Sequence, residues 1–323
     1  LWVEPEMVSE DSDLYRAHPD WAMVIPGRRP VRSRQQLVLD FSREEVADYI
    51  FDSLCRVLDS ANVEYLKWDM NRSVIDVYSA LAGCAEQGEV LYKYTLGLYR
   101  FLDRIGRRYP NILIEGCCGG GGRFDAGMLY YGPQIWCSDN TDAIDRIRIQ
   151  YGTSFGYPIS AVGSHVSAVP NHQTGRSVPL KTRGAVAMAG SFGYELDLGK
   201  LTPAEKEEVK VQVKAYKDNW KLIQDGDYYR LSNPYEPDGL GAWEFAAEDG
   251  SEALLTVVAL NTHGNPLTSY VRLKGLRADG WYRDEAAGRM YEGRALMEGG
   301  IPVPHMEDEY QSWQMHLRLC EER

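Results

Sequence analysis

Apolar and polar residues follow two alternating patterns over the first two-thirds of the chain. Short runs of mostly apolar residues predict strands that are buried in a sheet, whereas apolar residues three or four positions apart predict amphipathic helices. Strands are expected at residues 1–7, 64–72, 111–117, 134–137, 159–170 and 190–198. Helices are expected at residues 42–61, 88–108, 143–151, 176–188 and 202–222. Strand and helix therefore alternate about six times, which is typical of a parallel β/α array.

Capping residues support two of the predicted helix starts. Ser42 and Glu45 have the spacing of a capping box. Thr202, Pro203 and Glu205 combine an N-cap residue, a proline in the first turn and a second capping box. We therefore expect a helix to begin at each of these positions.

The pattern changes after Asp225, where short alternating runs are separated by turn residues. This pattern of short alternating runs is typical of a small antiparallel β domain. We place the boundary near Gly226, with a barrel domain at residues 1–225 and a C-terminal β domain at residues 226–323. The predicted fold class is α/β: a partial (β/α)₈ barrel of about six βα units, followed by a small antiparallel β-sandwich. A full barrel has eight units, so about two would precede Leu1.

Residues 64–72, EYLKWDMNR, place charged and polar side chains at alternate positions. In a strand, Lys67, Asp69 and Asn71 would project from one face, and Trp68 and Met70 from the other. Burying unpaired charge is costly, so an inward Lys67 and Asp69 indicate a functional pocket at the strand's C-terminal end, as in a β/α barrel. The alternative is a Lys–Asp pair on a sheet edge.

Carboxylates stand near the ends of several predicted strands. They are Glu4, Glu6, Asp69, Glu115 and Asp139. Two carboxylates that face each other across a pocket could hydrolyse a glycosidic bond, one as nucleophile and one as acid/base. Lys67 would keep Asp69 ionised and favour the nucleophile role. An apolar contact with Trp136 would favour the protonated form of Asp139, as an acid requires.

Four consecutive glycines, residues 119–122, follow the predicted strand at 111–117. Such a run could cradle a phosphate, but the spacing of a Walker motif is absent. Glycines that permit positive φ, or that let the backbone approach a ligand closely, are the better interpretation.

Composition narrows the possible partners. The 323 residues carry a formal net charge of −12, which argues against a nucleic acid. No run of apolar residues is long enough to span a membrane. Eight Trp and 21 Tyr suit contacts with sugar faces. The six cysteines show no metal-ligand spacing, so we expect reduced thiols, a cytoplasmic protein, and no metal or cofactor.

Several sequence blocks, in order, closely resemble bacterial α-galactosidases of glycoside hydrolase family 36. They are LWVEPEM, DLYRAHPDWA, RQQLVLDF, KWDMNR, GGGGRFDAGML, WCSDNTDAIDRIRIQYG and AVGSHVSAVPNHQ, and they extend from Leu1 to about Leu198. The resemblance implies a retaining exo-α-galactosidase that acts on melibiose- and raffinose-type sugars. It implies Asp69 as nucleophile and Asp139 as acid/base, with Asp142 as a structural helix cap.

The resemblance also implies a galactose site. The matching positions are Trp2, Arg34, Lys67, Asn71, Cys117 and Gly119. Arg34 could also be a surface cation, on composition alone. The implied partners are α-galactoside oligosaccharides, and the family forms tetramers, so a homo-oligomer is expected.

The chain departs from the family at its start. Family members carry an N-terminal β-sandwich and two earlier barrel strands, one with an LDDG-like acidic pair that grips galactose, and no LDDG occurs here. We therefore expect the 323 residues alone to be inactive or nearly so. The alternatives are a non-catalytic or galactoside-binding remnant, and a galactosyl transferase that uses the same covalent intermediate.

Overall fold

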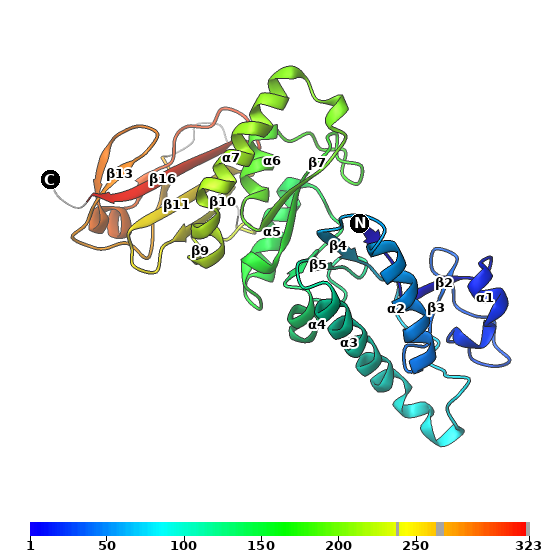
Figure 1. The fold of residues 1–323 in the computed structure, drawn as a ribbon. Coiled ribbons are helices and arrows are strands. Elements are labelled where there is room, and N and C mark those ends of the chain that lie inside the picture. The colour runs from blue at the N-terminus through cyan, green and yellow to red at the C-terminus, as the bar shows by residue number, and fades with distance from the viewer. Residues whose placement is uncertain (237–238, 263–267, 321–323) are drawn as a thin grey trace. The chain divides into compact units, whose positions relative to one another are not determined.

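The computed structural model describes residues 1–236, 239–262 and 268–320. The chain folds into two compact units, one from Leu1 to Asp139 and one from Asn140 onward (Figure 1). This division falls inside the predicted barrel domain, and the domain boundary near Gly226 remains a prediction.

The first unit contains a four-stranded sheet in the order β1-β4-β5-β6, and all of its strand pairs are parallel. The predicted strand at residues 1–7 is in fact divided, because β1 joins this sheet while β2 pairs antiparallel with β3. The elements are β1 (Trp2–Val3), β2 (Met7–Ser9), α1 (Asp13–Ala17), β3 (Gln36–Val38), α2 (Glu44–Leu58), β4 (Tyr65–Trp68), α3 (Val90–Arg108), β5 (Leu113–Gly116), α4 (Ala126–Tyr131) and β6 (Gln134–Ile135).

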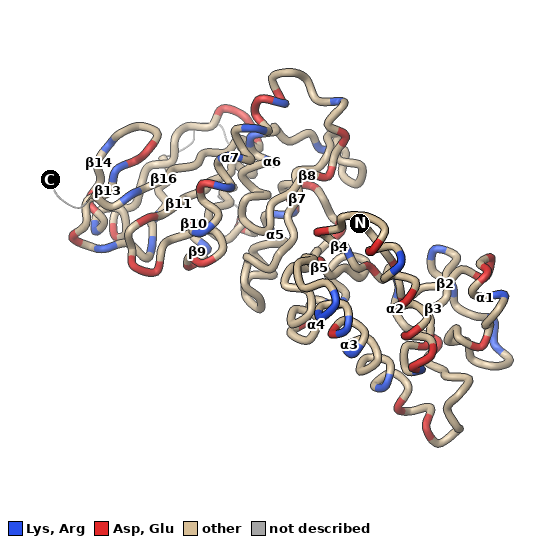
Figure 2. The backbone as a smooth tube through the Cα atoms, in the orientation of Figure 1, with Lys and Arg blue, Asp and Glu red and all other residues tan. Residues whose placement is uncertain are grey.

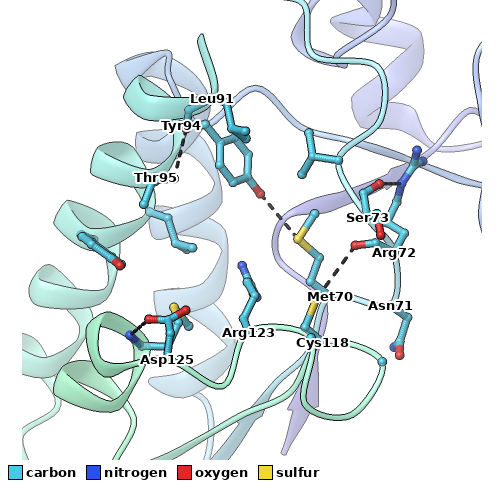
Figure 3. A pocket seen from close by; sticks show the side chains of 16 residues that line it. Met70, Asn71, Arg72, Ser73, Leu91, Tyr94, Thr95, Cys118, Arg123 and Asp125 are labelled. Atoms are coloured by element: carbon cyan, nitrogen blue, oxygen red, sulfur yellow. Dashed lines mark hydrogen bonds between the residues drawn. The ribbon is translucent and has the colours of Figure 1, made fainter. Parts of the chain in front are cut away.

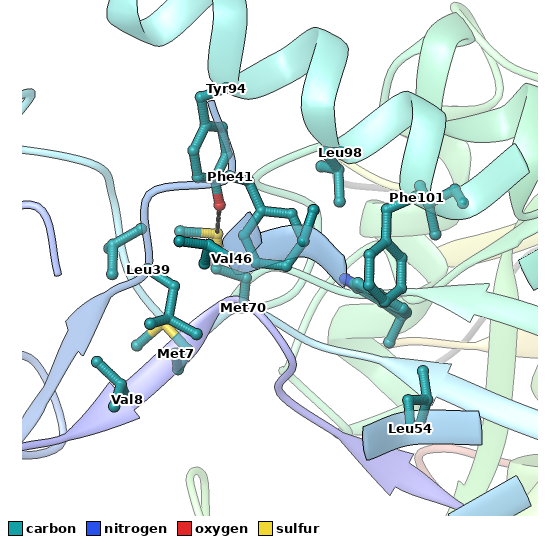
Figure 4. Close-up of a cluster of buried hydrophobic side chains, with 14 of the residues drawn as sticks. Met7, Val8, Leu39, Phe41, Val46, Leu54, Met70, Tyr94, Leu98 and Phe101 are labelled. Atoms are coloured by element: carbon teal, nitrogen blue, oxygen red, sulfur yellow. Dashed lines mark hydrogen bonds between the residues drawn. The ribbon is translucent and has the colours of Figure 1, made fainter. Parts of the chain in front are cut away.

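One face of this sheet is apolar and packs against helices. Leu66 and Trp68 of β4 are fully buried there, and Ile135 of β6 is nearly so. The ring of Trp68 meets that of Phe101 on α3 edge to face, with centroids 5.3 Å apart. The ring of Phe41 contacts those of Tyr94 and Phe101, and the three are labelled in Figure 4. The sheet therefore has its hydrophobic core on one side, and its other face is available for polar side chains.

Helix α3 approaches the backbone of Phe41 at a glycine. A Cβ atom added to Gly97 would lie 1.8 Å from the Phe41 carbonyl oxygen. Gly106, on the same helix, has no atom within 4 Å of its added Cβ. Gly97 is therefore required by packing, whereas Gly106 is not.

A buried carboxylate joins three elements of the first unit. Glu6, which is fully buried, accepts hydrogen bonds from Trp68 Nε1 on β4 (2.8 Å) and from the Tyr94 hydroxyl on α3. Arg123, in the glycine-rich loop, donates to both of its oxygens at 2.9 and 3.0 Å. Burial raises the pKa of Tyr94 well above its usual value, and the charge of Glu6 adds to this. Glu6 is thus a structural residue here.

In its described residues, the second unit contains two parallel strands joined by a helix, and then an antiparallel sheet. Strands β7 and β8 pair parallel, and the six-stranded sheet has the order β14-β13-β16-β11-β10-β9. The elements are α5 (Ala143–Thr153), β7 (Gly163–Ser167), α6 (Leu180–Ala187), β8 (Ser191–Glu195), α7 (Pro203–Asp225), β9 (Asp227–Arg230), β10 (Leu240–Ala246), β11 (Glu252–Ala259), β12 (Tyr270–Val271), β13 (Trp281–Asp284), β14 (Met290–Glu292), β15 (Ile301–Pro302) and β16 (Ser312–Cys320). Six strand–helix units in the described residues, from β1–α2 to β8–α7, agree with the predicted number.

The two predicted capping boxes have different outcomes. The one at Thr202 is confirmed, because Thr202 and Glu205 bond each other's backbone N–H groups. The one at Ser42 is wrong, because the Ser42 hydroxyl donates to Asp40 instead. Helix α2 consequently begins one residue later, with Arg43 at the N-cap.

Charged residues of both signs are interspersed along the helices and loops of each unit (Figure 2). Among the described residues, none of the helices has both the length and the apolar composition that crossing a bilayer requires.

The antiparallel sheet contains a buried carboxyl group, Glu244 on β10. Its Oε2 accepts a hydrogen bond from Lys274 N (2.9 Å), and its Oε1 accepts none from the residues that the structure describes. Burial raises the pKa of Glu244 to about 8. The folded chain therefore holds a proton there that the unfolded chain would release.

We expect Gly97→Ala to lower the free energy of unfolding by about 3 kcal/mol, because the added methyl group overlaps backbone. Gly106→Ala is the matched control on the same helix, and it should raise stability by up to about 1 kcal/mol through helix propensity. Urea unfolding of both variants tests this. Equal effects of the two substitutions would contradict the packing argument.

We expect the free energy of unfolding to fall by about 4 kcal/mol as pH rises from 5 to 8.5, through Glu244. The unfolded chain releases this proton near the ordinary pKa of 4.5, whereas the folded chain holds it up to a pKa of about 8. Glu244→Gln should remove most of this pH dependence in urea titrations. Glu248→Gln, at an exposed position in the next turn, should leave it unchanged.

Candidate active site

The second face of the four-stranded sheet carries a row of polar side chains. The parallel register sets Trp2 beside Lys67, Lys67 beside Glu115, and Glu115 beside Gln134. Asp69 lies two residues beyond Lys67, so it points to the same face. Its backbone N–H bonds the Val3 carbonyl at 2.9 Å, which continues the ladder beyond β4. The alternation predicted from EYLKWDMNR therefore produces a polar face opposite the core.

Asp69 is 5% exposed and is held by three donors. Its Oδ2 accepts from Trp2 Nε1 at 3.1 Å and from Asn71 Nδ2 at 2.8 Å. Its Oδ1 accepts from Met70 N at 2.8 Å. These bonds fix the orientation of the carboxylate, as a nucleophile requires.

Asn71 links Asp69 to a second carboxylate. Its Nδ2 also donates to Glu4 Oε1 at 2.7 Å. Arg34 Nη1 lies 3.9 Å from the same oxygen, although the Arg34 side chain is 59% exposed. Arg34 thus lies at the margin of this cluster, and the sequence had not linked Glu4 to Asn71.

Lys67 lies between the middle strands of the sheet. Its Nζ is 3.2 Å from Glu115 Oε1 and 4.9 Å from the ring centroid of Trp136. The sequence had paired Lys67 with Asp69 and had not predicted the contact with Glu115.

Asp139 follows β6 and contacts Trp136 through a hydrogen bond. The indole Nε1 donates to Asp139 Oδ1 at 3.0 Å, so a contact expected to be apolar is polar. In the second unit, Asp142 accepts from the N–H groups of Ile144 and Asp145, which confirms its prediction as the cap of α5.

The glycine run positions the segment that contains Asp139. Gly119 and Gly120 have φ values of +54° and +81°, as expected for glycines that permit positive φ. A Cβ on Gly120 would lie 2.9 Å from Asp139 N, and one on Gly121 would lie 2.5 Å from the Cys137 carbonyl oxygen. The close approach is therefore to the backbone of residues 137–139, and no side chain fits between the two segments.

Cys117 and Gly119 complete the set of predicted residues on this unit. Burial, and next the charge of Asp69, raise the pKa of Cys117 to about 12, so the thiol stays protonated near neutral pH. At Gly119, no atom lies within 4 Å of an added Cβ, which leaves open space beside the loop.

A cavity of 590 Å³ adjoins the candidate site (Figure 3). Its lining residues are Met70, Asn71, Arg72, Ser73, Val74, Leu91, Tyr94, Thr95, Leu98, Tyr99, Cys118, Gly119, Gly122, Arg123, Asp125 and Met128. Of the predicted site residues, only Asn71 and Gly119 border it. The cavity is therefore a neighbour of the polar face, and Asp69 and Asp139 do not line it.

Metal chemistry has no evident ligand set. Within residues 1–236, 239–262 and 268–320, no three His, Cys, Asp or Glu side chains are grouped to hold an ion.

Comparisons with known proteins assign a family to both parts of the chain. Residues 1–226 match the family model described as Melibiase, and residues 240–317 match the glycosyl hydrolase family 36 C-terminal domain. The chain is 57% identical over 314 residues to the bifunctional alpha-galactosidase/sucrose kinase AgaSK of Mediterraneibacter gnavus. The aligned region covers 97% of this chain and 33% of that protein. The chain is 52% identical over 322 residues to alpha-galactosidase AgaA of Geobacillus stearothermophilus, and this alignment covers 100% of this chain and 44% of AgaA.

Solved structures agree with this assignment. The crystal structure of AgaA matches with a TM-score of 0.96 at 52% identity, covering 99% of this chain and 44% of that chain. The alpha-galactosidase of Lactobacillus brevis matches with a TM-score of 0.97 at 43% identity, covering 100% and 44%. These matches confirm the predicted fold class, a barrel segment followed by an antiparallel β domain.

The chain thus spans between 33% and 44% of the length of these relatives. The melibiase model matches well over half of the chain, and the resemblance read from the sequence is confirmed. The chain belongs to the melibiase family, glycoside hydrolase family 36.

Proposed function

We propose that this chain supplies the catalytic carboxylates and part of the galactose site of a retaining exo-α-galactosidase. The observation that carries the proposal is the setting of Asp69. The carboxylate is buried, held by Trp2 and Asn71, and on the same sheet face as Lys67. A carboxylate fixed by donors at the end of a parallel strand is well placed to attack a bound sugar.

Relatives support the substrate class. AgaA variants of Geobacillus stearothermophilus have been crystallised with raffinose and with stachyose. Each of these two variants has one aspartate replaced, and the two replaced aspartates are as many positions apart as Asp69 and Asp139. Replacing a catalytic carboxylate allows an intact substrate to persist, so this spacing favours the same pair here.

In the proposed mechanism, Asp69 attacks the anomeric carbon while Asp139 protonates the departing glycosidic oxygen. The bond from the anomeric carbon to the leaving group breaks, and a galactosyl ester of Asp69 forms. Asp139 then takes a proton from water, whose oxygen displaces Asp69 and regenerates both carboxyl groups. The carboxyl groups of the two residues would lie about 5–5.5 Å apart, as in other retaining enzymes.

The remaining site residues would bind galactose. Lys67 and Asn71 can hydrogen-bond sugar hydroxyls beside Asp69, and the half-exposed Trp2 ring offers an apolar face to the sugar's C–H groups. Cys117, protonated near neutral pH, can act as a weak donor. Gly119 keeps side-chain volume out of the pocket, and Arg34 would contribute from its margin.

Further properties of the whole protein belong to the same proposal. The whole protein would form a homo-oligomer, as the resemblance to the family implies. A cytoplasmic location is supported by the six cysteines, all of which are free thiols. Transfer of galactose to a sugar acceptor in place of water is the alternative reaction, because both proceed through the same galactosyl–enzyme. A non-catalytic galactoside-binding role is the other alternative.

The roles of the two carboxylates are separable by experiment. Asp69→Asn should reduce turnover of melibiose and aryl α-galactosides by roughly a thousandfold or more, because no ester can form. Asp139→Asn should reduce melibiose turnover by about 10²–10⁴-fold. With a dinitrophenyl galactoside, which needs no acid, Asp139→Asn should accumulate a galactosyl–enzyme detectable by mass spectrometry.

The test protein is the chain joined to the part of the Geobacillus stearothermophilus relative that it does not match, with the 323 residues alone as the comparison. We expect the 323 residues alone to show little turnover. An adduct on the Asp69→Asn variant would contradict the assigned roles. Galactose binding without turnover by the joined protein would favour the non-catalytic alternative, and oligosaccharide products in place of free galactose would favour the transferase.

A further inference from the structure

Glu115 is a buried carboxylate that the proposed mechanism does not use. It lies in the middle of β5, its side chain has no exposed surface, and the register sets it between Lys67 and Gln134. An isolated charge in such a place is costly, so its partners indicate what it does.

Each oxygen of Glu115 has a separate set of partners. Oε2 accepts hydrogen bonds from the Tyr65 hydroxyl on β4 and from Gln134 Nε2 on β6. Burial, and next the charge of Glu115, raise the pKa of Tyr65, so the phenol keeps the proton that it donates. Oε1 faces Lys67 Nζ at 3.2 Å. Two neutral donors on neighbouring strands thus orient the carboxylate, and its other oxygen meets the ammonium group.

The position of Lys67 matters for both candidate catalytic residues. Its ammonium group lies 4.9 Å from the ring centroid of Trp136, and the indole of Trp136 donates to Asp139. Lys67 also lies on β4 two residues before Asp69, which directly follows that strand. A flexible four-carbon side chain would not hold this position by itself, because lysine loses much rotamer freedom when its head is fixed.

We propose that Glu115 is a positioning residue for galactose binding. It holds the Lys67 ammonium group beside Asp69, where the ammonium group can hydrogen-bond the hydroxyls of a bound galactose. This inference rests on the proposed function. Tyr65 and Gln134 are neutral hydrogen-bond donors that orient the Glu115 carboxylate. Glu115 affects galactose binding through Lys67. A purely structural ion pair would stabilise the fold but would not change how galactose binding depends on pH.

Removing the charge of Glu115 should weaken galactose binding in a defined way. Glu115→Gln keeps the shape of the side chain but removes the negative charge that lies 3.2 Å from the ammonium group. The dissociation constant for galactose should rise about 10–100-fold, the effect of a charged hydrogen bond. The loss should grow as pH rises, because the charged form of a partly buried ammonium group is less favoured once a facing carboxylate is removed.

The experiment is isothermal titration of galactose into the joined protein between pH 6 and 9. The variants are Glu115→Gln, Lys67→Gln and the double variant, with thermal unfolding measured alongside. Glu115 acts through Lys67, so the double variant should bind no more weakly than Lys67→Gln. Glu244→Gln is the control, since it makes the same substitution at another buried carboxyl group, on β10 of the second unit, and should leave the galactose affinity unchanged.

Glu115→Asp keeps the proposal testable if Glu115→Gln does not fold. It retains the charge but shortens the side chain, so it should bind galactose with intermediate affinity and with the pH dependence of the wild type. Wild-type affinity of Glu115→Gln at every pH, or additive losses in the double variant, would overturn the inference while leaving the proposed function standing. Failure of the wild-type protein to bind galactose would overturn both.

Discussion

The first unit depends on one buried ion pair, between Glu6 and Arg123. Glu6 lies on the core side of the sheet, where it accepts from Trp68, Tyr94 and both Nη atoms of Arg123. Burial alone would lower the pKa of Arg123, but the charge and the hydrogen bonds of Glu6 act together in the opposite direction, and the pKa is raised. Since either partner alone would be a buried unpaired charge, β4, α3 and the glycine-rich loop are held together.

This constraint extends to the candidate site through the glycine-rich loop. Arg123 anchors the loop through its ion pair with Glu6, and Gly120 and Gly121 lie against the backbone of residues 137–139. That contact sets the position of the segment ending in Asp139. Asp69 is positioned separately, by the parallel ladder and by Trp2 and Asn71. The two candidate catalytic carboxylates are therefore positioned by different contacts within one unit.

The chemistry of the polar face follows from the period of the strand. Alternate residues share a face, so apolar Leu66 and Trp68 enter the core while Lys67 and Asp69 enter the polar row. The roles of the other carboxylates did not follow from this period. Glu6 and Glu115 occupy similar places near strand ends in the sequence, yet one is a core residue and the other pairs with Lys67. Their difference depends on contacts with distant elements.

The amino-acid sequence was sufficient to predict the alternation of strands and helices, the face shared by Lys67, Asp69 and Asn71, and the family. These features are local patterns, or long blocks matched in order, and neither requires distant contacts. Three contacts became visible only in the folded chain: Ser42 bonds Asp40 rather than capping α2, Trp136 donates to Asp139, and Glu115 faces Lys67. Each of these depends on which backbone segments pack together, and that is set by the register of the sheet and by glycine contacts far apart in the chain.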